Sequence, residues 1–308
     1  MAVEMEKIAC LKQGDRVALA ATARFVTPAE MAPAVAVLES WGLQVQQPEG
    51  LYAVDGQLAG SDDHRAALMQ RLLDDPDIKA MFCVRGGYGT VRIIDRLDFT
   101  AFARQPKWIV GYSDVTVLHS HIHSQLGLPT LHGTMPINFP PPAEAAVPSL
   151  ESLKEWLFEG RCHMEFETGA LSREGEAEGV AVGGNLSILY SLCGSASQVD
   201  TRGKILIIED LDEYLYHIDR MMQNLKRCGM LEGLAGLVVG GLTEMHDNTV
   251  PFGRTAEEIV AEAVADYDYP VAFGAPVGHL GNLNHAIPLG VKMRMKVSNS
   301  KKSCIFAS

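Results

Sequence analysis

Residues 107–116 read Lys-Trp-Ile-Val-Gly-Tyr-Ser-Asp-Val-Thr, an apolar run that ends at Gly111 and is followed by Ser113. The run predicts a buried strand, and the residues after Ser113 predict the start of a helix. A serine at such a strand-to-helix turn projects from the sheet beside the free N–H groups of a helix N-terminus. A nucleophilic serine needs this arrangement. Val115 replaces the second glycine of the G-x-S-x-G motif, and an ordinary helix-capping serine is the alternative.

The segments on either side of this stretch alternate between strand and helix patterns. Strands are expected at residues 15–21, 43–47, 78–84 and 108–110, and helices at 27–41, 61–75, 90–97 and 114–125. Such alternation predicts parallel strands joined by crossover helices, and therefore an α/β fold. Because sites in parallel sheets form beyond the carboxyl ends of the strands, we expect Ser113, Gly86 and Gly87 to face one crevice.

A proline-rich segment, residues 136–148, divides the chain and includes Phe139-Pro140-Pro141-Pro142. It cannot form a regular helix or a central strand. We interpret it as a linker between an N-terminal domain, residues 1–135, and a C-terminal domain, residues 149–308. In the second domain, helices are expected at 149–158, 216–228 and 255–265, and strands at 204–208, 234–239, 271–275 and 291–297.

Charge and composition argue against several classes of protein. The chain has 308 residues, a net charge of -12 and no run of lysine or arginine, which argues against nucleic acid and anionic membranes as partners. Six scattered cysteines without a C-x-x-C pair argue against a disulfide framework. The N-terminus lacks the apolar segment of a signal peptide, and no apolar run approaches a membrane span. These features predict a protein of the reducing cytoplasm.

Three histidines, His119, His121 and His123, fall in one predicted helix. His119 and His123 are four residues apart and share a face, a spacing found among metal ligands. No glutamate accompanies them as in the H-E-x-x-H motif. A partly exposed helix face is therefore the favoured interpretation, and we predict no metal.

Polar residues follow two other predicted strands. Glu209 and Asp210 come directly after the apolar residues 205–208, and an acid in that position is partly buried and needs a partner. A histidine is a natural partner for such an acid. His279 follows another strand through Gly278, which lets the imidazole approach another group closely. The alternatives are a loop histidine with a structural hydrogen bond and an Asp210 that caps the next turn.

Residues 85–89, Arg-Gly-Gly-Tyr-Gly, form a glycine-rich loop after a predicted strand. They match neither G-x-G-x-x-G nor a P-loop. The backbone N–H groups of such a loop can hold a phosphate, or they can stabilise the oxyanion of a tetrahedral intermediate. A tight turn without a chemical role is the third interpretation.

Taken together, these motifs resemble the LD-carboxypeptidases, serine peptidases of cytoplasmic peptidoglycan recycling. The matching blocks are residues 85–89, 111–116 (Gly-Tyr-Ser-Asp-Val-Thr), 183–186 (Gly-Gly-Asn-Leu), 209–210 with 218–221 (Ile-Asp-Arg-Met), and 278–279 with 288–290 (Pro-Leu-Gly). They occur in family order over nearly the whole chain. The resemblance implies an N-terminal α/β sandwich with a parallel sheet, a C-terminal, mostly β, swivelling domain, and a site between the two.

The resemblance also implies which residues act. It implies a triad of Ser113 as nucleophile, His279 as general base and Glu209 as the acid that orients it. The backbone N–H groups of Gly87 and Asp114 are the implied oxyanion donors. No metal or other cofactor is implied, and members of the family are commonly homodimers.

The implied reaction is the release of D-alanine from a murein tetrapeptide, by cleavage after the L-centre of diaminopimelate or lysine. A carboxypeptidase must bind a free carboxylate, and Arg85 and Arg220 are candidates for that role. Asn185, in the third matching block, is a further candidate for substrate binding.

Other functions stay open at this point. The microcin C immunity peptidases of the same family act on peptidyl-nucleotides and need an aromatic platform for the adenine. Trp41, Trp108 and Trp156 offer no obvious platform. A non-catalytic, two-lobed protein that binds a nucleotide or sugar is a second alternative. An acyl-transferring enzyme with the same triad and a non-peptide acceptor is a third.

Overall fold

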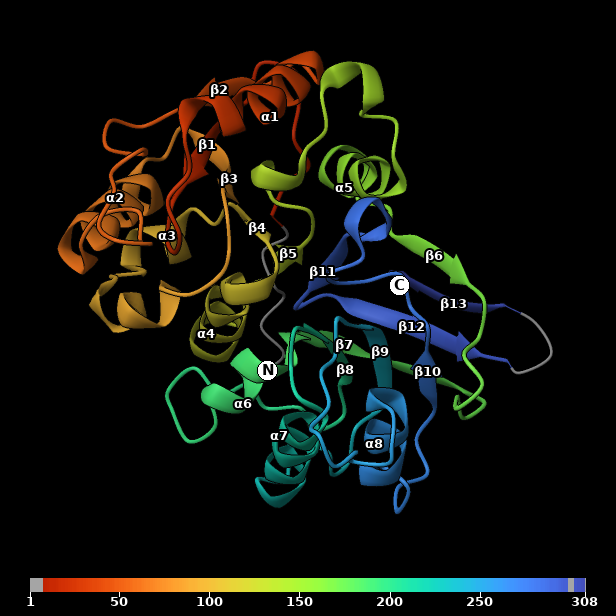
Figure 1. The fold of residues 1–308 in the computed structure, drawn as a ribbon. Helices are drawn as coiled ribbons and strands as arrows, with labels where there is room; N and C mark the ends of the chain where they lie inside the picture. Colours follow the sequence, from red (N-terminus) through yellow and green to blue (C-terminus); the bar gives the residue numbers. More distant parts are fainter. Residues whose placement is uncertain (1–7, 299–301, 308) are drawn as a thin grey trace.

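The computed structural model describes residues 8–298 and 302–307, and its strands form two sheets, one in each half of the molecule (Figure 1). Within those residues, the first sheet has six strands in the order β11-β5-β4-β3-β1-β2. The strands are β1 (Arg16–Ala20), β2 (Gln44–Gln46), β3 (Ile78–Cys83), β4 (Trp108–Gly111), β5 (Thr130–His132) and β11 (Ile287–Leu289). Neighbouring strands are parallel, except that β11 runs antiparallel to β5.

Helices cover both faces of this sheet, and together they form the first lobe (Figure 1). The helices are α1 (Pro28–Ser40), α2 (Asp62–Asp74), α3 (Thr100–Arg104), α4 (Thr116–Leu126) and α5 (Pro148–Glu159). Successive residues of a strand point to opposite faces. Val110 therefore packs with α1 and α5, whereas Ile109 packs with α2, α3 and α4. This is the predicted α/β sandwich around a parallel sheet.

The second sheet and its helices form the second lobe. In the described part of the chain it has seven strands, in the order β10-β9-β8-β7-β12-β13-β6. They are β6 (His163–Phe166), β7 (Gly175–Asn185), β8 (Ile205–Leu211), β9 (Gly236–Thr243), β10 (Val271–Phe273), β12 (Lys292–Val297) and β13 (Ser303–Ala307). Strands β7 to β10 are parallel, and β12, β13 and β6 pair antiparallel.

Three helices connect the parallel strands of the second lobe and pack on one face of them. They are α6 (Leu186–Ser191), α7 (Leu215–Arg227) and α8 (Ala256–Ala263). Strand β12 confirms the alternation predicted for residues 291–297, because Met293, Met295 and Val297 are buried between exposed basic residues. The second lobe thus combines βαβ units with antiparallel strands.

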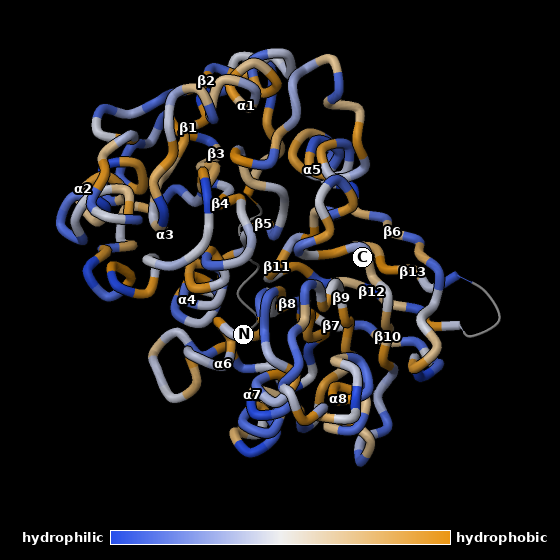
Figure 2. Tube along the Cα trace, viewed as in Figure 1, coloured by the Kyte–Doolittle hydropathy of each residue, from blue (hydrophilic) through white to orange (hydrophobic). Residues whose placement is uncertain are grey.

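Hydrophobic residues gather inside both lobes. Figure 2 shows them around β1, α5 and α8, whereas many peripheral loops are hydrophilic. Among residues 8–298 and 302–307, no helix combines the length and apolarity needed to cross a bilayer.

The segment expected to form a helix at 90–97 instead forms two short 3-10 turns, Thr90–Arg92 and Ile94–Arg96. A tertiary bond holds the first turn, because the Thr90 N–H donates to Asp114 Oδ2 at 3.0 Å. Helix α3 and strand β5 were not predicted from the sequence. They have only five and three residues, which are too few to show a periodic pattern.

Two segments that follow the proline-rich segment belong to the first lobe. Helix α5 contributes Leu150, Leu153 and Leu157 to its core, and β11 pairs with β5. The sequence after the proline-rich segment therefore contributes to both lobes. The division of the chain at residues 136–148 stays a prediction about domains.

Candidate active site

Ser113 begins a 3-10 turn, Ser113–Val115, that joins β4 to α4. Its φ is +62°, a left-handed conformation that is uncommon for a residue other than glycine. Such strained backbone persists where the surrounding structure holds it, and it gathers at functional sites. A Cβ atom added at Gly86 would lie 3.2 Å from Ser113 Oγ, so the glycine-rich loop lies directly against this serine.

His279 and Glu209 form a hydrogen-bonded pair. The Nδ1 atom of His279 lies 2.7 Å from Oε2 of Glu209, which is fully buried in β8. Gly278 makes this approach possible, because a Cβ atom there would lie 2.4 Å from the same carboxylate oxygen. Burial lowers the pKa of His279, but the hydrogen bond and charge of Glu209, with the charges of Asp210 and Glu244, together raise the pKa above its ordinary value.

Ser113 and His279 line one cavity of about 490 Å³ between the two lobes. Gly87 and Arg24 of the first lobe also line it, as do residues of β7, α6 and the segment after β8. The structure therefore brings a hydroxyl, an imidazole and glycine-loop N–H groups to one space, with Glu209 bonded behind the imidazole. Such a set can support nucleophilic catalysis at a carbonyl group.

Asp114 ties the serine turn to the loop that carries Gly87. Its side chain is buried, and Oδ2 accepts the N–H of Thr90 at 3.0 Å. Burial raises the pKa of Asp114 above its ordinary value. Arg65, fully buried in α2, supports the same loop by donating to the carbonyl oxygen of Gly89 at 2.9 Å. The two candidate oxyanion donors thus belong to turns that are linked by hydrogen bonds.

Asn185 lies on the cavity but its side chain is engaged by the protein. It caps α6, and its Nδ2 atom donates to Asp210 Oδ1 at 2.8 Å. Its backbone N–H donates to Thr116 Oγ1 of the first lobe at 3.0 Å. Burial raises the pKa of Asp210 to about 7. These contacts build the wall of the cavity, and a role for Asn185 in binding substrate stays a prediction.

The two arginines expected to bind a carboxylate lie outside the cavity lining. Arg85 Nη1 is 3.8 Å from Glu30 Oε1, and Arg220 lies over the ring of Tyr216. Arg24 lines the cavity instead. Sequence reasoning missed this residue, although it follows β1 at the carboxyl edge of the sheet, where sites are expected.

The histidines of α4 serve the packing of the helix. His119 is buried and bonded to Gly111 O at 2.9 Å and Thr130 Oγ1 at 2.8 Å, so a partly exposed face is wrong for this residue. Burial lowers the pKa of His119 and His123 to about 4. In the described residues, no group of three or more His, Cys, Asp or Glu side chains is arranged to hold a metal ion.

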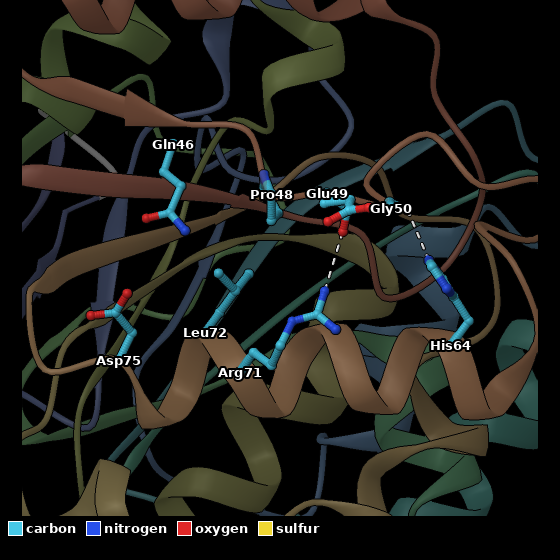
Figure 3. Close-up of a pocket in the computed structure, with 8 residues that line it drawn as sticks. All are labelled: Gln46, Pro48, Glu49, Gly50, His64, Arg71, Leu72 and Asp75. Atoms are coloured by element: carbon cyan, nitrogen blue, oxygen red, sulfur yellow. Dashed lines mark hydrogen bonds between the residues drawn. The ribbon is translucent and has the colours of Figure 1, made fainter.

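A larger cavity, of about 710 Å³, lies beside α2 and β2 (Figure 3). Its His64 and Arg71 side chains are bonded to the carbonyl oxygens of Gly50 and Glu49, at 2.8 and 3.2 Å. None of the predicted catalytic residues lines it. The smaller cavity between the lobes is therefore the candidate active site.

Two family signatures match the sequence. That of the LD-carboxypeptidase N-terminal domain matches residues 17–133, and that of the LD-carboxypeptidase C-terminal domain matches residues 178–295. The chain belongs to the LD-carboxypeptidase family. The resemblance inferred from the five sequence blocks is confirmed, and membership of this family makes the protein a peptidase.

The relatives of this chain are named either as murein peptide carboxypeptidases or as microcin immunity proteins. It is 37% identical over 298 residues to the "Probable murein peptide carboxypeptidase" of Bacillus subtilis (strain 168), which covers 94% of this chain and 91% of that protein. It is 26% identical over 306 residues to the "Microcin C7 self-immunity protein MccF" of Escherichia coli, covering 85% and 86%. The crystal structure of muramoyltetrapeptide carboxypeptidase from Oxalobacter formigenes matches with a TM-score of 0.84 and 26% identity, covering 95% of this chain and 99% of that one.

Proposed function

We propose that this family member is a serine LD-carboxypeptidase that releases the terminal D-alanine of murein tetrapeptides in peptidoglycan recycling. The observation that carries the proposal is the position of Ser113 and His279 on one cavity, with His279 bonded to the buried Glu209. The names of the relatives from Bacillus subtilis and Oxalobacter formigenes support the substrate. As the family resemblance implies, the proposal includes a cytoplasmic location and a homodimer.

In the proposed mechanism, His279 Nε2 accepts the proton of Ser113 Oγ while the oxygen attacks the carbonyl carbon of diaminopimelate or lysine. The N–H groups of Gly87 and Asp114 donate to the oxyanion that forms. His279 then gives its proton to the amine of the departing D-alanine. Water, deprotonated by His279, then attacks the acyl-enzyme, and His279 returns that proton to Ser113 Oγ as the ester bond breaks. Glu209 accepts the Nδ1–H of His279 throughout.

We assign the terminal carboxylate of the substrate to Arg24. This side chain lies on the cavity beside Gly87, where an added Cβ atom would be 2.7 Å from Arg24 Cδ. A guanidinium near the oxyanion donors suits a carboxylate one residue beyond the scissile bond, because it binds carboxylates through two parallel hydrogen bonds.

The alternative of a peptidyl-nucleotide substrate has less support. The three tryptophans pack in or against the core of the first lobe, with Trp41 on Phe139 and Trp108 on Trp156. Tyr88, with 47% of its surface exposed, is an aromatic residue on the cavity that a base could contact. A non-catalytic binding protein has no need of an imidazole–carboxylate pair, so the bond between His279 and Glu209 favours an enzyme.

Mass spectrometry of murein tri-, tetra- and pentapeptides after incubation with the protein tests the proposal. We expect the tetrapeptide to lose one D-alanine and the other two peptides to stay intact. An intact tetrapeptide would contradict the proposal, and cleavage of a peptidyl-adenylate in its place would favour the alternative. An added amine that appears in the product would indicate acyl transfer.

A further inference from the structure

The walls of the cavity beside Ser113 carry opposite charge. Arg24 lies on the wall that the first lobe supplies, next to Gly87. Glu213 lies on the wall that the second lobe supplies, between β8 and α7. A complementary ligand therefore carries negative charge near the oxyanion donors and positive charge toward α7.

Glu213 is a half-buried carboxylate of its wall. Its side chain is 21% exposed, against 68% for the neighbouring Asp212. The Oε2 atom of Glu213 lies 2.5 Å from Nδ1 of His217, one turn along α7. Among the residues that the structure describes, no group donates to its Oε1. One oxygen is thus held by the protein, and the other can accept a bond from a ligand.

Three other carboxylates, Asp114, Asp210 and Asp212, line the cavity. Asp210 is buried and accepts three hydrogen bonds from the Asn185 side chain and nearby backbone N–H groups. Asp114 accepts the N–H of Thr90 through Oδ2, and its Oδ1 is buried, without a partner among the described residues. Asp212 is exposed and lies 2.5 Å from His246 Nε2. Glu213 is therefore the half-buried carboxylate of this set, and it keeps an acceptor oxygen that the described residues do not use.

We propose that Glu213 is a specificity-determining residue that pairs with the side-chain ammonium of the residue before the scissile bond. This inference rests on the proposed function, in which that residue is diaminopimelate or lysine. Both carry an amine that is charged at neutral pH. An uncharged side chain of equal length would cover the carboxylate without pairing with it, which costs free energy. Because His217 holds the Glu213 side chain in one orientation, pairing with the ligand costs less side-chain conformational entropy.

The test uses two tetrapeptides, L-Ala-γ-D-Glu-X-D-Ala, in which X is lysine or norleucine, the same carbon chain without the amine. We expect kcat/KM of the wild type to be about 10- to 100-fold higher for the lysine peptide, a range that allows for the partial exposure of Glu213. Glu213→Gln keeps the size and the acceptor for His217, and it should reduce the ratio to about threefold or less. Glu232→Gln removes one charge from an exposed position away from the cavity and should keep the wild-type ratio.

Equal cleavage of both peptides by the wild type would overturn the inference, as would an unchanged ratio in Glu213→Gln. Either result leaves the proposed function standing, because D-alanine is still released. If neither peptide is cut, the proposed function fails, and calorimetric titration of Ser113→Ala still decides the inference. Tighter binding of the lysine peptide, lost when Glu213→Gln is added, would support it, and equal binding would overturn it.

Discussion

The Nδ1 atom of His279 lies 2.7 Å from Oε2 of Glu209, a carboxylate without exposed side-chain surface. A carboxylate only accepts hydrogen bonds, so Nδ1 carries the proton and Nε2 has its lone pair available for the serine proton. Because Glu209 stabilises the protonated ring, it raises the pKa of His279 against the effect of burial. We therefore expect this pair to determine how activity depends on pH.

Glu209→Gln is predicted to lower kcat/KM by about two to four orders of magnitude, because the amide does not stabilise the imidazolium and permits the wrong tautomer. The acid limb of the pH profile should also move to lower pH. The charge that raises the pKa of His279 is removed, whereas burial, which lowers it, remains. The measurement is kcat/KM for D-alanine release between about pH 5 and pH 9. An acid limb that stays in place or moves up would contradict this role of Glu209.

Gly278→Ala is predicted to disrupt the same pair. Its Cβ atom would lie 2.4 Å from Oε2 of the buried Glu209, at a φ of +97°. Gly281→Ala is the matched control, because Gly281 also has a positive φ but nothing within 4 Å of an added Cβ. The control should lose only about 1–2 kcal/mol from backbone strain and keep its activity. Gly278→Ala should lose more stability in urea denaturation, and kcat/KM should fall with it; equal behaviour of the two variants would refute the prediction.

Arg24→Met is predicted to raise KM for the tetrapeptide about 10- to 100-fold with a smaller change in kcat, because it removes a contact to the unreactive terminal carboxylate. Arg85→Met and Arg220→Met are the controls, since both side chains lie outside the cavity lining. Steady-state kinetics of D-alanine release compares the three variants. A larger effect at Arg85 or Arg220 than at Arg24 would contradict this assignment and favour one of those arginines as the carboxylate-binding residue.

Thr116→Val is predicted to weaken the junction between the lobes. The Thr116 hydroxyl is buried and accepts the N–H of Asn185 at 3.0 Å, so valine leaves a buried donor without a partner. The expected loss is about 1–3 kcal/mol in the free energy of unfolding. Ser120→Ala, in the same helix, removes a buried hydroxyl that has no hydrogen-bond partner among the described residues, and it should cost less. Urea denaturation monitored by circular dichroism measures both, and equal losses would argue against the contact.

Local patterns were enough to predict the elements that carry the reactive groups. The apolar residues 108–110, followed by Gly111, predicted a strand and where it ends. That prediction placed Ser113 at a strand-to-helix turn, where the structure also places it. The acid at 209 follows an apolar run and is buried. Pairing it with His279 needed the family resemblance, because no local pattern connects residues on β8 and after β10.

Features that depend on contacts between distant segments could not be predicted from the sequence. No sequence motif marks Arg24 or Glu213, because both lie in loops. The cavity that they share forms only where the two lobes meet. The pairing of β11 with β5 returns the chain to the first sheet without any local signal. Thr90 forms a 3-10 turn because its N–H is committed to Asp114, a contact that helix propensity does not include.

The most direct test of the central claim is the rate of D-alanine release from a murein tetrapeptide by Ser113→Ala. The account predicts release no faster than without enzyme, from a variant whose unfolding midpoint in urea matches that of the wild type. Release at the wild-type rate would show that the Ser113 hydroxyl is not the nucleophile, and the account would be wrong.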